Sequence, residues 1–119
     1  MESYKSLVAW KLAHEFAVAT LKSTDRAWTP RAKNAHDQLR RAAISVPTNI
    51  VEGYALGTSP QFARHLRIAV GSAAEAEYAI VLCRYCGYLS PETADELAHK
   101  AARMLSVLYG LLRKIRART

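Results

Sequence analysis

Hydrophobic residues recur every three or four positions along most of this chain, and the two-residue alternation of a β-strand is hard to find. A period near 3.6 places apolar side chains on one face of an α-helix. Four segments with this period are separated by short stretches that contain proline, glycine or polar residues. The pattern therefore predicts four amphipathic helices and an all-α fold.

The first helix is predicted over about residues 6–23. Its main stripe consists of Leu12, Phe16 and Ala19, with Trp10, Ala13 and Ala17 on the flank. Residues 24–30 contain Asp, Thr and Pro, which interrupt the period, so this stretch is predicted to be a linker.

The second helix is predicted over about residues 31–56. Leu39, Ala43, Val46 and Ile50 recur at helical spacing and form one buried stripe. Pro47 lies inside this run and removes one backbone donor, so we expect a kink near Ala43. The alternative is a complete break, with Pro47 opening a new helix. The apolar phase continues through Pro47, which favours the kink; Gly53 and Gly57 are predicted to end the segment.

The third helix has the most regular pattern. Ser59 is placed to cap its start, and Pro60 suits the first helical position. Apolar or small residues then alternate in steps of four and three, which defines a heptad seam. The seam consists of Phe62, Leu66, Ala69, Ala73, Ala76, Ile80, Cys83 and Gly87. Because its middle is alanine, we expect partner helices to approach closely there, and Gly87 marks the end.

The fourth helix repeats the same start signal with Ser90, Pro91 and Glu92. Its seam consists of Leu97, Ala101, Met104, Leu108, Leu111 and Ile115. The helix ends in a run of cations, which suits the negative end of the helix dipole.

Four helices joined by short loops are expected to pack as an up-down-up-down four-helix bundle. The 119 residues fit a single domain, 1–119. A domain of this size buries about two-thirds of its unfolded surface, so it folds without a disulfide or metal, and we expect no cofactor. The apolar stretches are too short for a membrane span and the start of the chain lacks a signal-peptide pattern, so a cytoplasmic location is expected.

Potential reactive groups fit ordinary structural roles better than catalysis. Cys83 and Cys86 form a Cys-x-x-Cys at the carboxyl end of a helix, where the dipole opposes thiolate formation, so we expect two partly buried, unreactive thiols. The four histidines (His14, His36, His65 and His99) are scattered one per helix and are interpreted as lone surface or boundary residues.

Glu75 and Glu77 interrupt the apolar third helix. The carboxylates of a di-metal bundle come with Glu-x-x-His motifs on two helices, and this chain has none. We expect instead a salt bridge to Arg40, Arg41 or Arg67 on a neighbouring helix or subunit. An enzyme is the least favoured class; a substrate pocket lined by Glu75 and His65 would revive it.

The net charge is +7, from 17 Lys and Arg against 10 Asp and Glu, which biases the protein toward polyanions. The candidate nucleic-acid-binding residues are Arg40, Arg41, Arg64, Arg67, Arg113, Lys114, Arg116 and Arg118. Arginine dominates this set, and its guanidinium suits bidentate phosphate contacts. An ordinary solvated face is the alternative. Tyr85, Tyr88 and Tyr109 are near basic residues and could stack bases, although bundle-edge packing also explains them.

Several blocks of the chain resemble one known family. They are residues 4–11, which read Tyr-Lys-Ser-Leu-Val-Ala-Trp-Lys, together with residues 38–53, 62–72 and 87–90. The most specific block is Leu-Arg-Arg-Ala-Ala followed by Pro-x-Asn-Ile-x-Glu-Gly. These blocks are similar to the bacterial four-helix-bundle family named for a protein encoded in intervening sequences of 23S ribosomal RNA genes.

The resemblance implies a bundle that assembles into a ring-shaped homopentamer. Accessory variability proteins of diversity-generating retroelements are similar in fold, and there a basic pentamer binds a reverse transcriptase and RNA. The matching motif positions are Arg40, Arg41, Ser45, Pro47, Asn49, Glu52, Gly53, Arg64 and Gly71. Pro47 and Gly53 would shape the second helix, while Asn49 and Glu52 would cap or pair across the corner to the third.

Two functional hypotheses follow. The first is a non-enzymatic, homo-oligomeric protein that binds RNA or other nucleic acid nonspecifically through its Arg and Lys side chains. The second is a structural oligomeric scaffold for a protein partner, in which the charge serves solubility.

Overall fold

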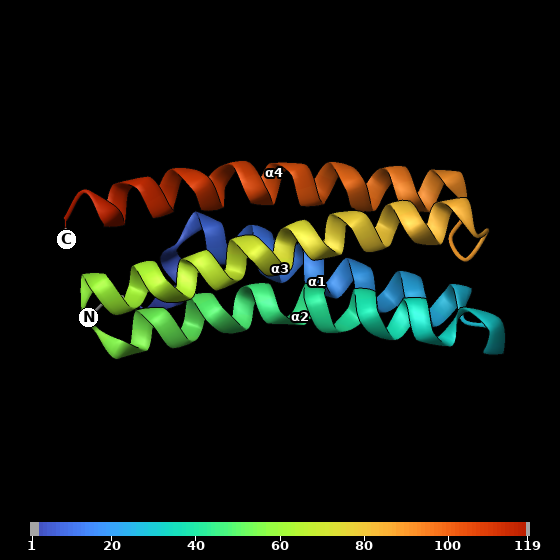
Figure 1. The fold of residues 1–119 in the computed structure, drawn as a ribbon, viewed down its shortest axis with the longest axis horizontal. Helices are drawn as coiled ribbons and strands as arrows, with labels where there is room; N and C mark the ends of the chain where they lie inside the picture. The colour runs from blue at the N-terminus through green and yellow to red at the C-terminus, as the bar shows by residue number, and fades with distance from the viewer. Residues whose placement is uncertain (1–2, 119) are drawn as a thin grey trace.

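The computed structural model describes residues 3–118, so residues 1–2 and 119 of the predicted domain lie outside it. In chain order the elements are the 3-10 helix η1 (Tyr4–Ser6), α1 (Val8–Ala27), the 3-10 helix η2 (Pro30–Ala32), α2 (Lys33–Leu56), α3 (Ser59–Tyr85) and α4 (Pro91–Arg116). The four long helices lie side by side in a body of 45 × 21 × 20 Å (Figure 1). Each packs against the next in the chain, and α1 also packs against α4. The all-α four-helix bundle with up-down packing is confirmed.

The core follows the predicted seams of α2, α3 and α4 closely, except that Leu111 of the α4 seam is only partly buried while Leu112 is buried. Leu39, Ala43, Val46 and Ile50 are all fully buried, so the predicted stripe of α2 is confirmed. In α3 the seam is buried from Leu66, Ala69, Ala73 and Ala76 to Ile80 and Cys83, whereas Phe62 is partly buried and Gly87 is exposed. The alanines allow a close approach, and α2 and α3 form the most extensive helix pair in the bundle.

The first helix departs from its prediction in both length and orientation. It continues to Ala27 rather than ending near residue 23, and its most buried side is lined by Ala13, Phe16 and Ala17, with Leu12 and Ala19 only half-buried. Thr20 and Thr24 are also buried on this side. Polar residues in the core line weaken the hydrophobic period, which explains why the pattern predicted an early end.

The second helix runs without a break through Pro47, which excludes a new helix starting there. Gly53 does not end the helix, because it lies inside α2 and is buried. The end comes at Gly57, whose φ of +79° is in the left-handed region that favours glycine.

The starts of α3 and α4 carry the expected caps with one shift. Thr58, not Ser59, caps α3, and its hydroxyl accepts the N–H of Gln61. Ser90 caps α4 as predicted, accepting the N–H of Thr93. The prediction failed at α3 because Thr58 and Ser59 are both good capping residues, and only the backbone conformation distinguishes them. Gly87, with φ +74°, follows the end of α3.

Candidate nucleic-acid interface

A chain of polar side chains crosses the boundary between α2 and α3. The hydroxyls of Ser45 and Ser72 lie 2.8 Å apart, and the Asn49 side-chain amide donates to the Ser45 hydroxyl at 3.1 Å and to its carbonyl at 2.9 Å. On its other side, Oδ1 of Asn49 lies 3.0 Å from Nδ1 of His65. Asn49 therefore links both helices through one side chain.

His65 is the centre of this network and is only 7% exposed. Because Oδ1 of Asn49 can only accept, Nδ1 of His65 carries the proton in their hydrogen bond. Nε2 then accepts from the Arg64 guanidinium, whose Nη2 lies 3.4 Å away. The Glu52 carboxylate lies 3.8 Å from Nδ1. Asn49 and Glu52 thus pair across the α2–α3 boundary, and the network holds Arg64 beside it.

Gly53 allows the two helices to approach at this point. A Cβ built at position 53 would lie 2.7 Å from the Cβ of His65 and 3.0 Å from Cδ1 of Phe62. A Cβ atom in a folded protein essentially never lies closer than 3.0 Å to another heavy atom. A larger residue at position 53 would therefore push α3 away from α2. The motif residues Asn49, Glu52 and Gly53 therefore fix the position of the first half of α3.

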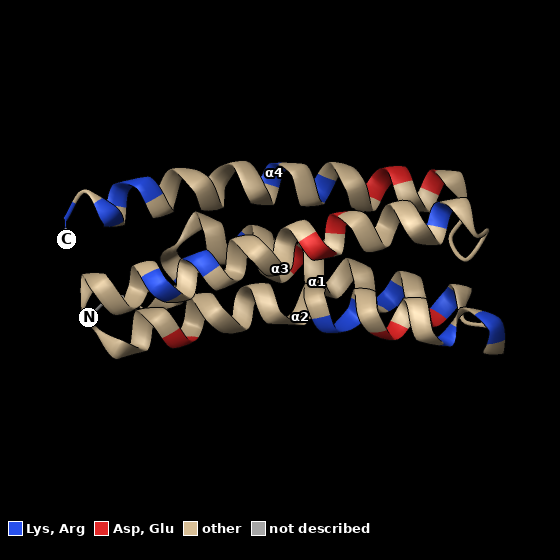
Figure 2. Ribbon diagram, viewed as in Figure 1, with Lys and Arg blue, Asp and Glu red and all other residues tan. Residues whose placement is uncertain are grey.

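Six cations of α3, α4 and the residues just after α4 lie at one end of the bundle. We call this the basic end, and it consists of Arg64, Arg67, Arg113, Lys114, Arg116 and Arg118, all exposed. The antiparallel packing of α3 and α4 brings the start of one helix to the end of the other (Figure 2). The acids of α4 lie in its first turns, and residues 97–118 contain none. Figure 2 shows a short acidic segment on α2 toward the same end.

Arg40 and Arg41 lie apart from the basic end, in the first half of α2. The Arg40 guanidinium donates to the Leu21 carbonyl at 3.1 Å, to the Thr24 hydroxyl at 2.7 Å and to Asp25 at 2.9 Å. It therefore ties the end of α1 to α2. Arg41 is exposed and donates to Oε1 of Gln38 at 3.0 Å.

Within the chain, Glu75 does not form the predicted salt bridge to Arg40, Arg41 or Arg67. Its carboxylate accepts from the Gln38 side-chain amide at 2.6 Å instead of from an arginine. The Gln38 side-chain carbonyl in turn accepts from Arg41, so the Gln38 amide bridges the Arg41 guanidinium and the Glu75 carboxylate. The exposed position of Glu75 explains the difference, because a carboxylate in contact with water needs no ionic partner.

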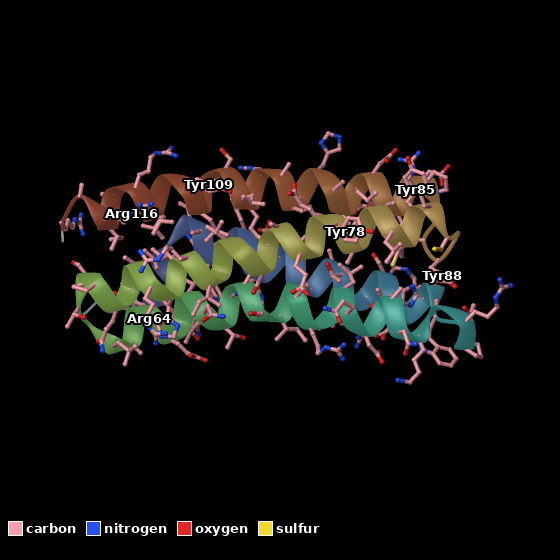
Figure 3. The ribbon with its side chains drawn as sticks, viewed as in Figure 1. Arg64, Tyr78, Tyr85, Tyr88, Tyr109 and Arg116 are labelled. Atoms are coloured by element: carbon pink, nitrogen blue, oxygen red, sulfur yellow. The ribbon has the colours of Figure 1, made fainter. Side chains whose placement is uncertain are left out.

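Of the three tyrosines predicted as candidates for base stacking, Tyr85 and Tyr88 lie far from the basic end. Figure 3 shows Arg64 and Arg116 toward one end of the bundle and Tyr85 and Tyr88 toward the other. Tyr88 is partly buried against the core, and its carbonyl lies 2.9 Å from Nε2 of His36. Tyr109 lies on α4, between these ends, and is 45% exposed.

Two histidines and one cysteine are more buried than the sequence indicated. His36 and His65 are buried, so their interpretation as surface or boundary residues was wrong, whereas His14 and His99 are exposed. Cys83 is buried and Cys86 exposed, so the expectation of two partly buried thiols was wrong. Burial raises the pKa of the Cys83 thiol to about 11, and the neighbouring Cys86 adds to the rise.

Within residues 3–118, no three His, Cys, Asp or Glu side chains are grouped so that they could hold a metal ion. None of the helices in this range combines the length and hydrophobicity that a bilayer crossing requires.

Sequence reasoning missed the connecting role of His65, because the pattern indicated only a lone surface or boundary histidine. The signal for it was present: Ser45, Asn49 and Glu52 follow one another at steps of four and three, which places a polar line on one face of α2. A polar line beside a buried stripe indicates that a facing helix supplies a partner. The identity of that partner depended on the packing register of α3.

Fold and surface together define a basic four-helix bundle with a cluster of exposed cations at one end. The chain belongs to the 23S rRNA-intervening sequence protein family, whose model matches residues 5–110. A similar fold is found in the crystal structure of a protein of unknown function from Bacteroides thetaiotaomicron, assigned to the S23 ribosomal protein family. That structure has a TM-score of 0.78 and 21% sequence identity, covering 88% of this chain and 98% of the other. Among curated proteins, none matches this chain.

Proposed function

We propose that this protein is a non-enzymatic, homo-oligomeric RNA-binding protein that contacts phosphates nonspecifically through the basic end. The strongest support is the cluster of cations at this end, which consists of Arg64, Arg67 and the cations of residues 113–118. The second half of α4, which carries most of them, contains no Asp or Glu. Such a surface attracts a polyanion because each contact releases a condensed counterion. Arg40 and Arg41 contribute less to this surface, since Arg40 already serves three acceptors inside the chain.

Self-association is proposed to use the outer face of α3. Ile68, Tyr78, Leu82 and Tyr85 are 41%, 64%, 40% and 86% exposed. Together with Arg64, Gly71 and Glu75 they follow steps of four and three, a second heptad line on the side of α3 away from the core. A helix whose outer line exposes four large apolar side chains favours a second partner, and another copy of this chain would bury them. The ring-shaped homopentamer implied by the family resemblance is the proposed form.

The RNA proposal is tested by fluorescence anisotropy with a labelled single-stranded RNA over a range of salt concentrations. Affinity should fall steeply as salt rises, with a slope of about 0.7 for each neutralised phosphate. The double variant Arg67→Gln/Arg113→Gln should bind more weakly and show a shallower slope. The matched control Lys11→Gln/Lys22→Gln removes the same charge from α1 and should bind almost as the wild type does. Absence of binding at low salt, or equal loss in both variants, would refute the proposal.

The oligomer is tested by sedimentation velocity over a range of protein concentrations. Leu82→Glu places a charge on the outer face of α3 and should shift the protein to smaller species. Tyr109→Glu alters an exposed apolar residue of α4, 45% exposed, and should leave the assembly unchanged. A wild-type protein that stays monomeric at high concentration contradicts the oligomer.

The second candidate function is a structural scaffold for a protein partner. It is favoured by exposed apolar side chains away from α3, such as Trp28, which is 52% exposed at the end of α1. A pull-down that still enriches one protein after nuclease treatment, from a protein that binds no RNA, would support this function over the first.

A further inference from the structure

A cavity of about 580 Å³ opens at the basic end. It lies where the end of α2, the first turn of α3 and the last turns of α4 meet, and Leu7 closes it from the start of the chain. Its apolar lining is formed by Leu7, Tyr54, Phe62, Leu111 and Ile115. The rings of Tyr54 and Phe62 pack edge to face with centroids 6.1 Å apart, so the two aromatic side chains form one wall.

The polar lining of the same cavity is cationic. Lys114, in the last turn of α4, and Arg118, just after the helix ends, both line it. The hydroxyl residues Thr58 and Ser59 line it from the start of α3. Among residues 3–118, those that line the cavity include no Asp or Glu. The cavity therefore offers an apolar and aromatic surface beside two positive charges, and its volume lies in the range of sites for small ligands, about 300–1,000 Å³.

We propose that this cavity binds the 5′-phosphorylated terminal nucleotide of an RNA strand. The base would lie against the Tyr54 and Phe62 wall, and the 5′-phosphate would be held by Lys114 and Arg118. A terminal phosphate carries up to two negative charges near neutral pH, whereas a phosphate inside the strand carries one, so the paired cations favour the end. Aromatic side chains accept any base, because every base has a π-face.

This inference rests on the proposed RNA binding and assigns a specific part of the RNA to a specific cavity. The remaining cations of the basic end lie outside the lining and would contact the rest of the strand nonspecifically; they are Arg64, Arg67, Arg113 and Arg116. The two roles can therefore be separated by the chemistry of the RNA end.

The test compares two short single-stranded RNAs of the same sequence, labelled at the 3′ end, with either a 5′-monophosphate or a 5′-hydroxyl. Binding is measured by fluorescence anisotropy at one salt concentration. The wild type should bind the 5′-phosphorylated strand about tenfold more tightly, the change expected from one charge-assisted contact. Lys114→Gln and Arg118→Gln should each reduce this preference, and the double variant should abolish it. Both residues are exposed, so these variants should fold.

The control Arg113→Gln removes a neighbouring charge of α4 outside the cavity. This variant should bind both RNAs more weakly by the same factor and keep the preference for the phosphorylated end. Equal wild-type affinities for the two RNAs would overturn the inference while leaving nonspecific RNA binding intact, whereas absence of binding to either would refute both. Uridine 5′-monophosphate is the probe for a free ligand: if it binds as tightly as the phosphorylated RNA, the cavity is a nucleotide site and the assignment to an RNA end is wrong.

Discussion

Gly53 of α2 lies directly against His65 of α3: a Cβ at position 53 would be 2.7 Å from the Cβ of His65. The contact lies beside the hydrogen bond between His65 and Asn49, so close packing and polar pairing act at the same level of the bundle. Arg64, next in the chain to His65, donates to the imidazole. The geometry of this helix pair thus determines where Arg64, the first cation of the basic end, lies.

The glycine contact predicts the response to one added methyl group. Gly53→Ala should lower the free energy of unfolding by about 1–3 kcal/mol, because α2 and α3 must separate to admit the Cβ. Gly110→Ala is the control: its Cβ would meet only Nη2 of Arg113, at 4.0 Å. That variant should gain about 0.5–1 kcal/mol from the better helix propensity of alanine. Urea denaturation followed by circular dichroism measures both, and equal stabilities would contradict the packing account.

The polar network predicts a loss on removal of the Asn49 amide. Asn49→Ala leaves Nδ1 of the buried His65 without its 3.0 Å acceptor and should lower the free energy of unfolding by about 1–3 kcal/mol. Thr48→Ala changes the adjacent residue, which is exposed and bonds only within its own helix, to the Ile44 carbonyl. It should stay within about 0.5 kcal/mol of the wild type. Thermal melts of the two variants should therefore differ clearly.

Arg40 and Arg41 are neighbours in the chain but have different surroundings. Arg40→Met removes three hydrogen bonds to residues 21–25 and should lower the free energy of unfolding by about 1–3 kcal/mol. Arg41→Met loses one exposed bond to Gln38 and should change it by no more than about 0.5 kcal/mol. Chemical denaturation of the pair is the measurement, and similar losses for both would show that Arg40 does not anchor α1.

The two thiols should differ in reactivity while the protein is folded. Burial raises the pKa of Cys83 to about 11, so at pH 8 roughly one molecule in a thousand carries its thiolate, the reactive form. Cys86 is exposed and should react first. Mass spectrometry after iodoacetamide treatment should find one adduct on the native protein and two in urea. Two adducts formed at the same rate on the native protein would contradict the burial of Cys83.

The helices of this protein could be predicted because most of its core is aliphatic and evenly spaced. The stripe of Leu39, Val46 and Ile50 and the alanine seam of α3 are buried as their period indicated. The failure at α1 has a local cause. Thr24 can be buried because its hydroxyl donates to the Thr20 carbonyl and accepts from Arg40. A search for regularly spaced hydrophobic residues does not detect a buried threonine.

The candidate site was predictable only in its residue types. The excess of cations in the last helix is visible in the sequence, and so is the polar line of α2. The sequence does not show that Arg64 and Arg116 lie toward the same end while Arg40 is used to hold α1, because these outcomes depend on which helices are antiparallel neighbours. Side chains far apart in the chain meet only through packing.

By itself, then, the sequence determined four amphipathic helices, an alanine-lined α3 and an excess of positive charge, since each depends on spacing or composition alone. The tertiary structure decided the partner of His65, the contact at Gly53 and the cavity lined by Lys114 and Arg118. These three features arise from the register in which α2, α3 and α4 pack. That register is set by many small contacts acting together, and no single helix contains the information for it.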